Sequence, residues 1–232
     1  TKTLIAAGLL AATATANATV ILPGSETSLQ TIIDNITVGG PSSVDVNTDQ
    51  ASPDEVWKNT DSGISPTRFV AEIAGNAGTN TFGIYDTTNV SNSVELFSGS
   101  DSSGAITSFG LDVDGSVYIN LADTGIDFSG TTFGFYLGTP STSFYSEKAK
   151  NGGEDQMVAF QGTGTDTIDL PGFGGPTSWT QGGWLLAFED TLYSQSDKDF
   201  NDMVIFVESA EPVSEPATLA LLGLGLAGLG FA

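Results

Sequence analysis

The sequence predicts an all-β fold of the β-sandwich or jelly-roll-like kind, with one short N-terminal helix and an apolar helix at the C-terminus. Two observations predict this fold. Short apolar runs that alternate with polar residues recur along residues 67–210, and clusters of glycine, serine and asparagine separate them. The chain also has 29 glycines but only 6 lysines and arginines among its 232 residues, which fits an extracellular β-domain.

The N-terminal residues 1–18 are expected to form a secretory signal peptide. Lys2 precedes an apolar run, and small residues then lead to Ala16-Asn17-Ala18. A positive start, a short apolar stretch and an A-x-A site are the features of a cleaved export signal. The apolar run is shorter than the about 20 residues of a membrane-spanning helix. We therefore expect cleavage after Ala18 and a mature chain that begins at Thr19.

Residues 19–66 are expected to form a helix followed by a loop-rich segment. Thr27 or Ser28 can cap the helix, and the residues after them show apolar side chains at helical spacing. These apolar residues are Leu29, Ile32, Ile33 and Ile36. The following stretch, 39–66, is rich in glycine, proline, serine, asparagine and aspartate, and it indicates a long loop with room for one strand.

The body of the chain, residues 67–210, is expected to form the sandwich. Short β-type runs alternate there with turn-forming residues, as they do in antiparallel sheets. The expected strands span residues 69–73, 81–85, 93–97, 106–111, 116–119, 132–137, 156–160, 183–188 and 203–207. Asp114-Gly115 lies between two of these runs and favours a hairpin turn over a cation-binding loop at 112–115.

The composition excludes several classes of function. The formal net charge of −22 argues against a nucleic-acid partner, because phosphate backbones are bound by clustered lysine and arginine. The chain has no histidine and no cysteine, which excludes Ser-His-Asp and Cys-His catalysis, the usual zinc sites and disulfides. Hard-cation binding through oxygen atoms, carboxylate catalysis and non-catalytic roles remain.

The densest polar cluster lies between the last two expected strands. Its candidate metal ligands are Glu189, Asp190, Asp197, Asp199, Asn201 and Asp202. The oxygens of residues 197, 199 and 201 can converge in a looping backbone, and antiparallel strands would bring residues 189 and 202 together. Ca²⁺ takes about six to eight oxygen ligands in irregular geometry, and a bound cation relieves the repulsion between crowded carboxylates. The cluster therefore predicts a Ca²⁺ site.

Two other interpretations of this acidic cluster are a loop that binds no cation and an EF-hand. The cluster could be a solvated acidic loop in an acidic protein. An EF-hand would take residues 197, 199, 201 and 208 as loop positions 1, 3, 5 and 12. However, Asp202 occupies the position where an EF-hand requires glycine, and a strand-like run replaces the following helix.

Two further alternatives concern carbohydrate. Glu189 and Asp199 could act as the paired acids of a glycosidase, which needs two carboxyls in a cleft with unequal pKa values. A carbohydrate-binding module would instead need an exposed aromatic platform. Trp179, in the loop 172–183, is the expected platform, whereas Trp184 lies in an apolar run and is expected in the core.

The C-terminal residues 211–232 form a proline-bounded linker and an apolar tail. Glu215-Pro216 precede residues 217–232, which contain no charged residue and alternate leucine with glycine and alanine, as membrane helices do. This segment resembles the PEP-CTERM sorting signal of Gram-negative bacteria, although Ser214 stands where the first proline usually is. The resemblance implies export, transient inner-membrane anchoring through the C-terminal helix, and processing by an exosortase-type membrane protease.

Residues 183–190 and 196–204 resemble the C-terminal signature of a bacterial surface domain of unknown function found in calcium-associated adhesins. Residues 152–160 resemble its preceding strand, although Gln156 stands where that pattern often has histidine. The resemblance implies a β-rich surface domain with a calcium site, to which Asp155 could add a ligand. It implies no established activity.

Together these features predict a non-enzymatic exported protein of the cell surface or extracellular matrix. We expect it to bind Ca²⁺ and to be associated with exopolysaccharide, biofilm or adhesion. The alternatives are a carbohydrate-binding module that recognises surface glycans and, less favoured, a carboxylate-based glycosidase.

Overall fold

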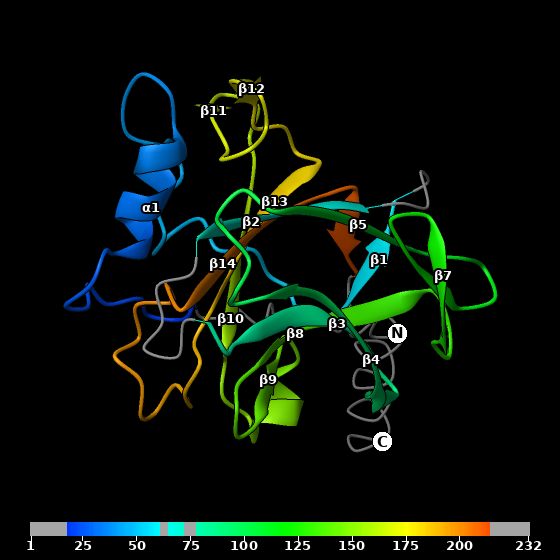
Figure 1. The fold of residues 1–232 in the computed structure, drawn as a ribbon. Coiled ribbons are helices and arrows are strands. Elements are labelled where there is room, and N and C mark those ends of the chain that lie inside the picture. Colours follow the sequence, from blue (N-terminus) through cyan, green and yellow to red (C-terminus); the bar gives the residue numbers. More distant parts are fainter. Residues whose placement is uncertain (1–17, 61–64, 72–77, 214–232) are drawn as a thin grey trace, which may run out of the picture.

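The computed structural model describes residues 18–60, 65–71 and 78–213 (Figure 1). It confirms the predicted all-β class with one short helix. The predicted C-terminal apolar helix lies outside these residues, and so does almost all of the predicted signal peptide. Within the described part of the chain, no helix is both long enough and apolar enough to cross a membrane.

The described strands form two large antiparallel sheets and one small hairpin. The first sheet has the order β15 (Ala210–Pro212), β1 (Trp57–Asn59), β8 (Thr132–Gly138), β3 (Thr81–Asp86), β4 (Asn89–Ser98), and β9 (Ser143–Tyr145) also pairs with β8. The second has the order β10 (Met157–Gln161), β13 (Gly183–Phe188), β14 (Met203–Glu208), β2 (Ser65–Ala71), β5 (Ile106–Leu111), β6 (Ser116–Ile119), β7 (Ala122–Asp127). The hairpin joins β11 (Thr167–Ile168) to β12 (Thr177–Ser178).

The two large sheets pack face to face as a β-sandwich (Figure 1). Their facing sides form one apolar core, because successive strand residues point to opposite faces of a sheet. Trp57, Phe82, Phe133 and Phe135 enter this core from the first sheet, and Trp184, Leu186, Phe188 and Ile205 enter it from the second. β1 therefore contributes to the sandwich although it precedes residue 67.

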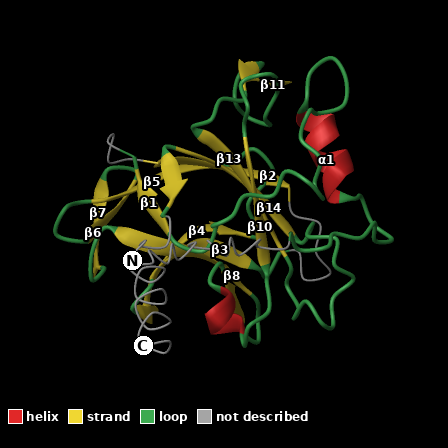
Figure 2. Cartoon of the chain, turned by 180° about the vertical axis from the view of Figure 1, so that it is seen from behind, coloured by secondary structure: helices red, strands yellow, loops and turns green. Residues whose placement is uncertain are grey.

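A second core covers the outer face of β10, β13 and β14. The alternate residues Val158, Phe160, Leu185, Ala187 and Phe206 face away from the sandwich and contact the N-terminal segment. Helix α1 (Leu29–Ile36) supplies the other side of this core through its four buried apolar residues, as its spacing predicts. Figure 2 shows, from behind, α1 and β11 on the same side of the molecule. This double burial explains why all six residues of β13 are buried.

Local signals in the sequence set several element ends. Ser28 caps α1, and its side chain accepts a hydrogen bond from the Thr31 backbone N–H. Asp114-Gly115 forms the predicted turn between β5 and β6, where Gly115 has a φ of 96° and donates its N–H to Asp112 O at 3.0 Å. A positive φ favours glycine, so the hairpin interpretation of residues 112–115 is confirmed.

Candidate metal centre

The predicted acidic loop, residues 189–202, connects β13 to β14. Phe188 pairs with Met203 in the antiparallel register, so the two ends of the loop are neighbours. The segment 19–27 runs beside the loop, and Leu22 N–H donates to Lys198 O at 2.8 Å. In Figure 1 this pairing brings the blue start of the described chain against the orange loop. The site thus joins two segments from opposite ends of the sequence.

Three carboxylates meet in this loop. Glu189, Asp197 and Asp199 each offer an oxygen atom, and these atoms all lie within 4.8 Å of one another. Glu189 and Asp199 are buried, with 0% and 1% of their surfaces exposed, whereas Asp197 is exposed. The cluster therefore has a buried inner side and one side open to solvent.

Each of the three buried side chains, Glu189, Asp199 and Asn201, has one polar atom in a hydrogen bond and one oxygen without a partner. Phe200 N–H donates to Glu189 Oε1 at 2.7 Å, and Asn201 Nδ2 donates to Asp199 Oδ2 at 2.9 Å and to Thr27 O at 2.9 Å. The buried atoms Glu189 Oε2, Asp199 Oδ1 and Asn201 Oδ1 accept no hydrogen bond. Buried polar atoms in folded proteins almost always have a partner. These three oxygens are thus buried acceptors without a hydrogen-bond donor.

The electrostatics of the cluster also favour a cation. Burial, followed by smaller contributions that include the charges of Asp199 and Asp197, raises the pKa of Glu189 to about 7. Burial and the charges of Asp197 and Glu26 raise the pKa of Asp199 to about 6. Carboxylates in such surroundings destabilise the folded chain when they ionise, and a divalent cation among them removes that penalty.

The backbone of the loop is tightly folded around these side chains. Lys198 and Phe200, on either side of Asp199, have positive φ values of 67° and 51°. Such values are uncommon for residues other than glycine. The Phe200 side chain is fully buried in the second core, and the Lys198 ammonium lies 4.8 Å from the centre of the Tyr193 ring. The lysine of the loop is therefore held at that ring by a cation–π contact.

The six ligands that the sequence predicts divide into two groups. Glu189, Asp197 and Asp199 form the carboxylate cluster, and the Asn201 side chain contacts Asp199 Oδ2. Asp190 and Asp202 instead contact each other, because Asp190 N–H donates to Asp202 Oδ2 at 2.7 Å. Asn80 Nδ2 donates to Asp190 Oδ2 at 3.1 Å, and burial with the charge of Asp190 raises the pKa of Asp202 to about 8.

The N-terminal segment 19–27 contributes two contacts to the site that the acidic motif alone does not predict. A Cβ atom on Gly24 would overlap Asp199 Oδ2 and would lie 3.0 Å from Asp197 Oδ2. The glycine thus allows the backbone to approach the carboxylates closely, and Thr27 orients Asn201 through its carbonyl. The sequence holds little signal for these roles, because a backbone contact has no side-chain signature.

Trp179 is not the exposed platform that the sequence predicts. The residue is fully buried in the second core, and its indole N–H donates to Gly183 O at 3.0 Å. The loop 172–183 folds back beside β13, so the apolar ring finds a more favourable place in the core than in solvent. Trp184 is buried in the sandwich core, as predicted.

The structure agrees with the rejection of an EF-hand, because residues 203–208 form β14 and Glu208 pairs with Gly183 at the opposite end of the strand from the loop. The expectation for Asp155 is not met. Asp155 lies outside the carboxylate cluster in the described structure. It forms an ion pair with Lys148 at 3.0 Å instead.

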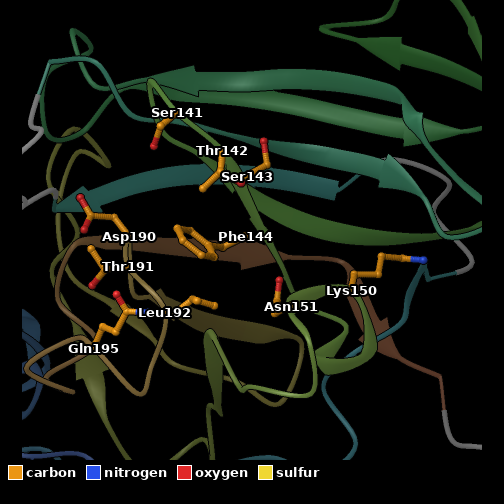
Figure 3. A pocket seen from close by; sticks show the side chains of 10 residues that line it. All are labelled: Ser141, Thr142, Ser143, Phe144, Lys150, Asn151, Asp190, Thr191, Leu192 and Gln195. Atoms are coloured by element: carbon orange, nitrogen blue, oxygen red, sulfur yellow. The ribbon is translucent and has the colours of Figure 1, made fainter.

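A polar pocket of about 490 Å³ lies beside the acidic loop (Figure 3). The β8–β9 connection and the first residue of β9 contribute the hydroxyl groups of residues 141–143, and the loop contributes Asp190, Thr191 and Gln195. Figure 3 shows Phe144 between these two sets of polar groups. The Lys150 amine is directed elsewhere, because it bonds to Thr87 O at 2.9 Å and to Glu147 at 3.2 Å.

Comparison with known proteins supports both resemblances drawn from the sequence. Residues 128–210 match a family described as a domain of unknown function (DUF4114), and residues 212–232 match the PEP-CTERM protein-sorting motif. No curated protein and no solved structure matches the chain. The sorting motif indicates an exported protein that is transiently anchored in the membrane and processed by exosortase. The DUF4114 match includes the whole 189–202 loop but none of the segment 19–27.

Proposed function

We propose that this exported chain is a non-enzymatic protein of the cell surface or extracellular matrix, and that its 189–202 loop binds Ca²⁺. The proposal depends above all on the three buried oxygens of Glu189, Asp199 and Asn201 that accept no hydrogen bond. A cation with several oxygen ligands gives each of them a partner. Asp197 completes the carboxylate group from the solvent side.

Ca²⁺ fits this arrangement better than Mg²⁺. Ca²⁺ accepts about six to eight oxygens at irregular angles, whereas Mg²⁺ requires a near-ideal octahedron and retains several waters. Here the ligands come from a folded loop with two positive-φ residues, and three of them are already fixed by hydrogen bonds. The exposed Asp197 leaves room for water to fill the remaining positions.

Bound Ca²⁺ would have a structural role. The loop ligands are tied to the N-terminal segment through Asn201 and Thr27 O and through the close approach of Gly24. Residues 21–46, which include part of this segment, supply seven of the 17 buried apolar residues of the second core. A cation that binds only the folded state stabilises it, so calcium would fasten the N-terminal segment to the outer face of the sandwich. Such a domain suits matrix, biofilm or adhesion structure.

A glycosidase is less compatible with these residues. The carboxyl oxygens of Glu189 and Asp199 lie within 4.8 Å, and both residues are almost fully buried. A glycosidase needs its two acids about 5–9.5 Å apart on either side of an accessible glycosidic bond. The polar pocket is lined by neither residue.

The calcium proposal is tested by thermal unfolding of the chain in EDTA and in millimolar Ca²⁺ or Mg²⁺. We expect Ca²⁺ to raise the Tm by roughly 5 to 10 °C when the free Ca²⁺ concentration is about 100-fold above the Kd. Asp199→Asn should abolish this shift, whereas the turn variant Asp112→Asn should retain it. An equal Tm in EDTA and Ca²⁺ for the unaltered chain would refute the calcium site.

The polar pocket favours saccharide binding as a second candidate function. Hydroxyl, amide and carboxylate groups surround an aromatic ring there, and saccharides are bound by this combination of hydrogen bonds and apolar contact. We expect a glycan array to show binding that is lost in Thr191→Ala and Gln195→Ala but retained in Asp112→Asn. Binding that survives both pocket substitutions would exclude this pocket as the saccharide site.

A further inference from the structure

The first residues of the predicted mature chain are held at a defined place. Thr19 N–H donates to Gln50 Oε1 at 2.8 Å, and Gln50 Nε2 donates back to Thr19 O at 2.7 Å. The Thr19 hydroxyl donates to Asp155 Oδ2, and the Tyr193 hydroxyl donates to Val20 O at 3.0 Å. These contacts bind the very residue at which cleavage after Ala18 would create a free amino group.

The surroundings of Thr19 are acidic, because more carboxyl groups than ammonium groups lie there. Asp155 Oδ2 is paired with Lys148 at 3.0 Å, but the buried Asp155 Oδ1 accepts no hydrogen bond. Behind it, burial and the charge of Asp155 raise the pKa of Asp54, and they contribute in the same direction at Glu55. Three carboxyl groups therefore share a single lysine. An additional positive charge beside Asp155 would stabilise all three as carboxylates.

We propose that the Asp155 carboxylate and the Gln50 amide form a binding site for the α-ammonium group of Thr19, which signal-peptide removal creates. Hydrolysis of the Ala18–Thr19 bond adds water, so that Ala18 leaves with a carboxylate and the Thr19 nitrogen becomes an amine. This amine takes up a proton at neutral pH, because α-amino groups titrate near 7.7–8.0.

The geometry suits this group. The Thr19 nitrogen and hydroxyl oxygen belong to the same residue and are separated by only a few bonds, so the nitrogen lies beside the carboxylate that the hydroxyl already contacts. In the uncleaved chain this nitrogen has one hydrogen, which Gln50 accepts. The ammonium group has two more donors, and Asp155 Oδ1 is the unpartnered buried acceptor next to it.

The consequence is that maturation fastens the start of the chain across the acidic loop. Thr19 precedes the contacts of Leu22 with Lys198, of Gly24 with Asp199 and of Thr27 with Asn201. An ion pair at Thr19 would hold the segment from its free end. This inference depends on cleavage after Ala18 but not on calcium, so either proposal can fail without the other.

The test compares chains that end at Ala232 in mild detergent and differ only at the N-terminus. One begins with the free amine of Thr19, released from a fusion cut directly before it, and the other carries an N-acetyl group on Thr19. In EDTA at pH 6.5 we expect the free amine to raise the Tm by roughly 2 to 6 °C. Equal Tm values for the two chains would overturn the proposal.

The pH dependence has a defined sign. An adjacent carboxylate raises the pKa of the ammonium group above its unfolded value, so its stabilisation is complete below about pH 7.7 and is lost as pH rises through the folded pKa. The titratable groups around Thr19 are Asp155, Lys148, Asp54, Glu55 and the Tyr193 phenol. The ammonium group lowers the pKa values of the nearby carboxyls, so their coupled titration remains in the difference between free and acetylated forms. The titration of groups far from Thr19 is common to both chains and cancels.

Two variants and one direct measurement complete the test. Asp155→Asn should remove the difference between free and acetylated chains, whereas Asp112→Asn should keep it. A nuclear magnetic resonance titration of the Thr19 nitrogen should give a pKa above 8 that falls in Asp155→Asn. A pKa at or below the ordinary range, or an exported protein whose first residue is not Thr19, would overturn the proposal.

Discussion

Asp86 and Asp199 are equally buried aspartates that differ in the hydrogen bonds their carboxylates accept. Each has 1% of its surface exposed. Asp86 accepts four hydrogen bonds, from the backbone N–H and hydroxyl groups of Thr88 and Ser129, at 2.7 to 2.9 Å. Asp199 is contacted by Asn201, whose side-chain amide donates to Asp199 Oδ2 at 2.9 Å, and Asp199 Oδ1 has no partner.

The pKa values of the two carboxyls follow this difference. Burial acts to raise the pKa of Asp86, but the hydrogen bonds from Ser129 and Thr88 outweigh it and lower the pKa. At Asp199 burial prevails and raises the pKa to about 6. Asp86 is thus a structural carboxylate that the protein neutralises with its own dipoles. Asp199 is a carboxylate that needs a cation to be equally well compensated.

The largest effect on the free energy of unfolding is expected from neutralising Asp86 or Asp199 separately. Asp86→Asn should lose about 2–4 kcal/mol of unfolding free energy with or without Ca²⁺, because an amide nitrogen cannot accept the Ser129 hydrogen bonds. Asp199→Asn in EDTA should change stability little or increase it, since it removes a repelled charge. Urea unfolding of both variants measures the contrast.

In Ca²⁺ the two substitutions should have different effects on stability. Asp199→Asn should then be less stable than the unaltered chain, whereas the deficit of Asp86→Asn should be the same as in EDTA. A loss of stability by Asp199→Asn in EDTA as large as that of Asp86→Asn would contradict the distinction between the two aspartates.

A smaller effect is expected from pH. Without metal, the folded pKa values of Glu189 and Asp199, about 7 and about 6, lie above the ordinary values of 4.5 and 3.8 for these side chains. The folded state then binds more protons than the unfolded state between about pH 4 and pH 7, so this contribution to stability falls as pH rises, by roughly 1.4 kcal/mol per pH unit for each proton. Asp86 contributes the opposite dependence, which appears only on acidification.

Thermal unfolding from pH 4.5 to 7.5 in EDTA and in Ca²⁺ tests this sign. The difference between the unaltered chain and the double variant Glu189→Gln, Asp199→Asn isolates the two groups from the other carboxyls. We expect the double variant to gain stability over the unaltered chain as pH rises in EDTA, and to lose that advantage in Ca²⁺. A pH-independent difference in EDTA would mean that neither carboxyl is strained.

The fold was predictable where the sequence carries local signals. Apolar spacing and a serine cap specify α1, and Asp114-Gly115 specifies a hairpin turn. The strand β7 was missed because it is mostly polar, and its place depends on pairing with β6. The three-residue strand β15 was also missed, and for β1 the sequence indicates only room for one strand somewhere in 39–66. The two strands pair with each other, and their register comes from partners distant in the sequence.

The site was predictable only in part, for a similar reason. Its loop ligands are neighbours in sequence, and carboxylates at alternate positions suggested a cation. The N-terminal contribution comes from a glycine and a backbone carbonyl, and Thr27 is 174 positions from Asn201. The burial of Trp179 was missed because the second core that covers it is built from segments far apart in the chain.

The smallest effect, and the most specific one, is expected at Gly24. Gly24→Ala places a methyl group against Asp199 Oδ2 and Asp197 Oδ2 without removing any ligand. We expect about a tenfold weaker Ca²⁺ affinity by calorimetry, because small displacements of ligands reduce the affinity of a built metal site. Gly130→Ala is the matched control, since its Cβ would meet no atom within 4 Å. If both variants bound Ca²⁺ as the unaltered chain does, the N-terminal segment would lie beside the centre without shaping it.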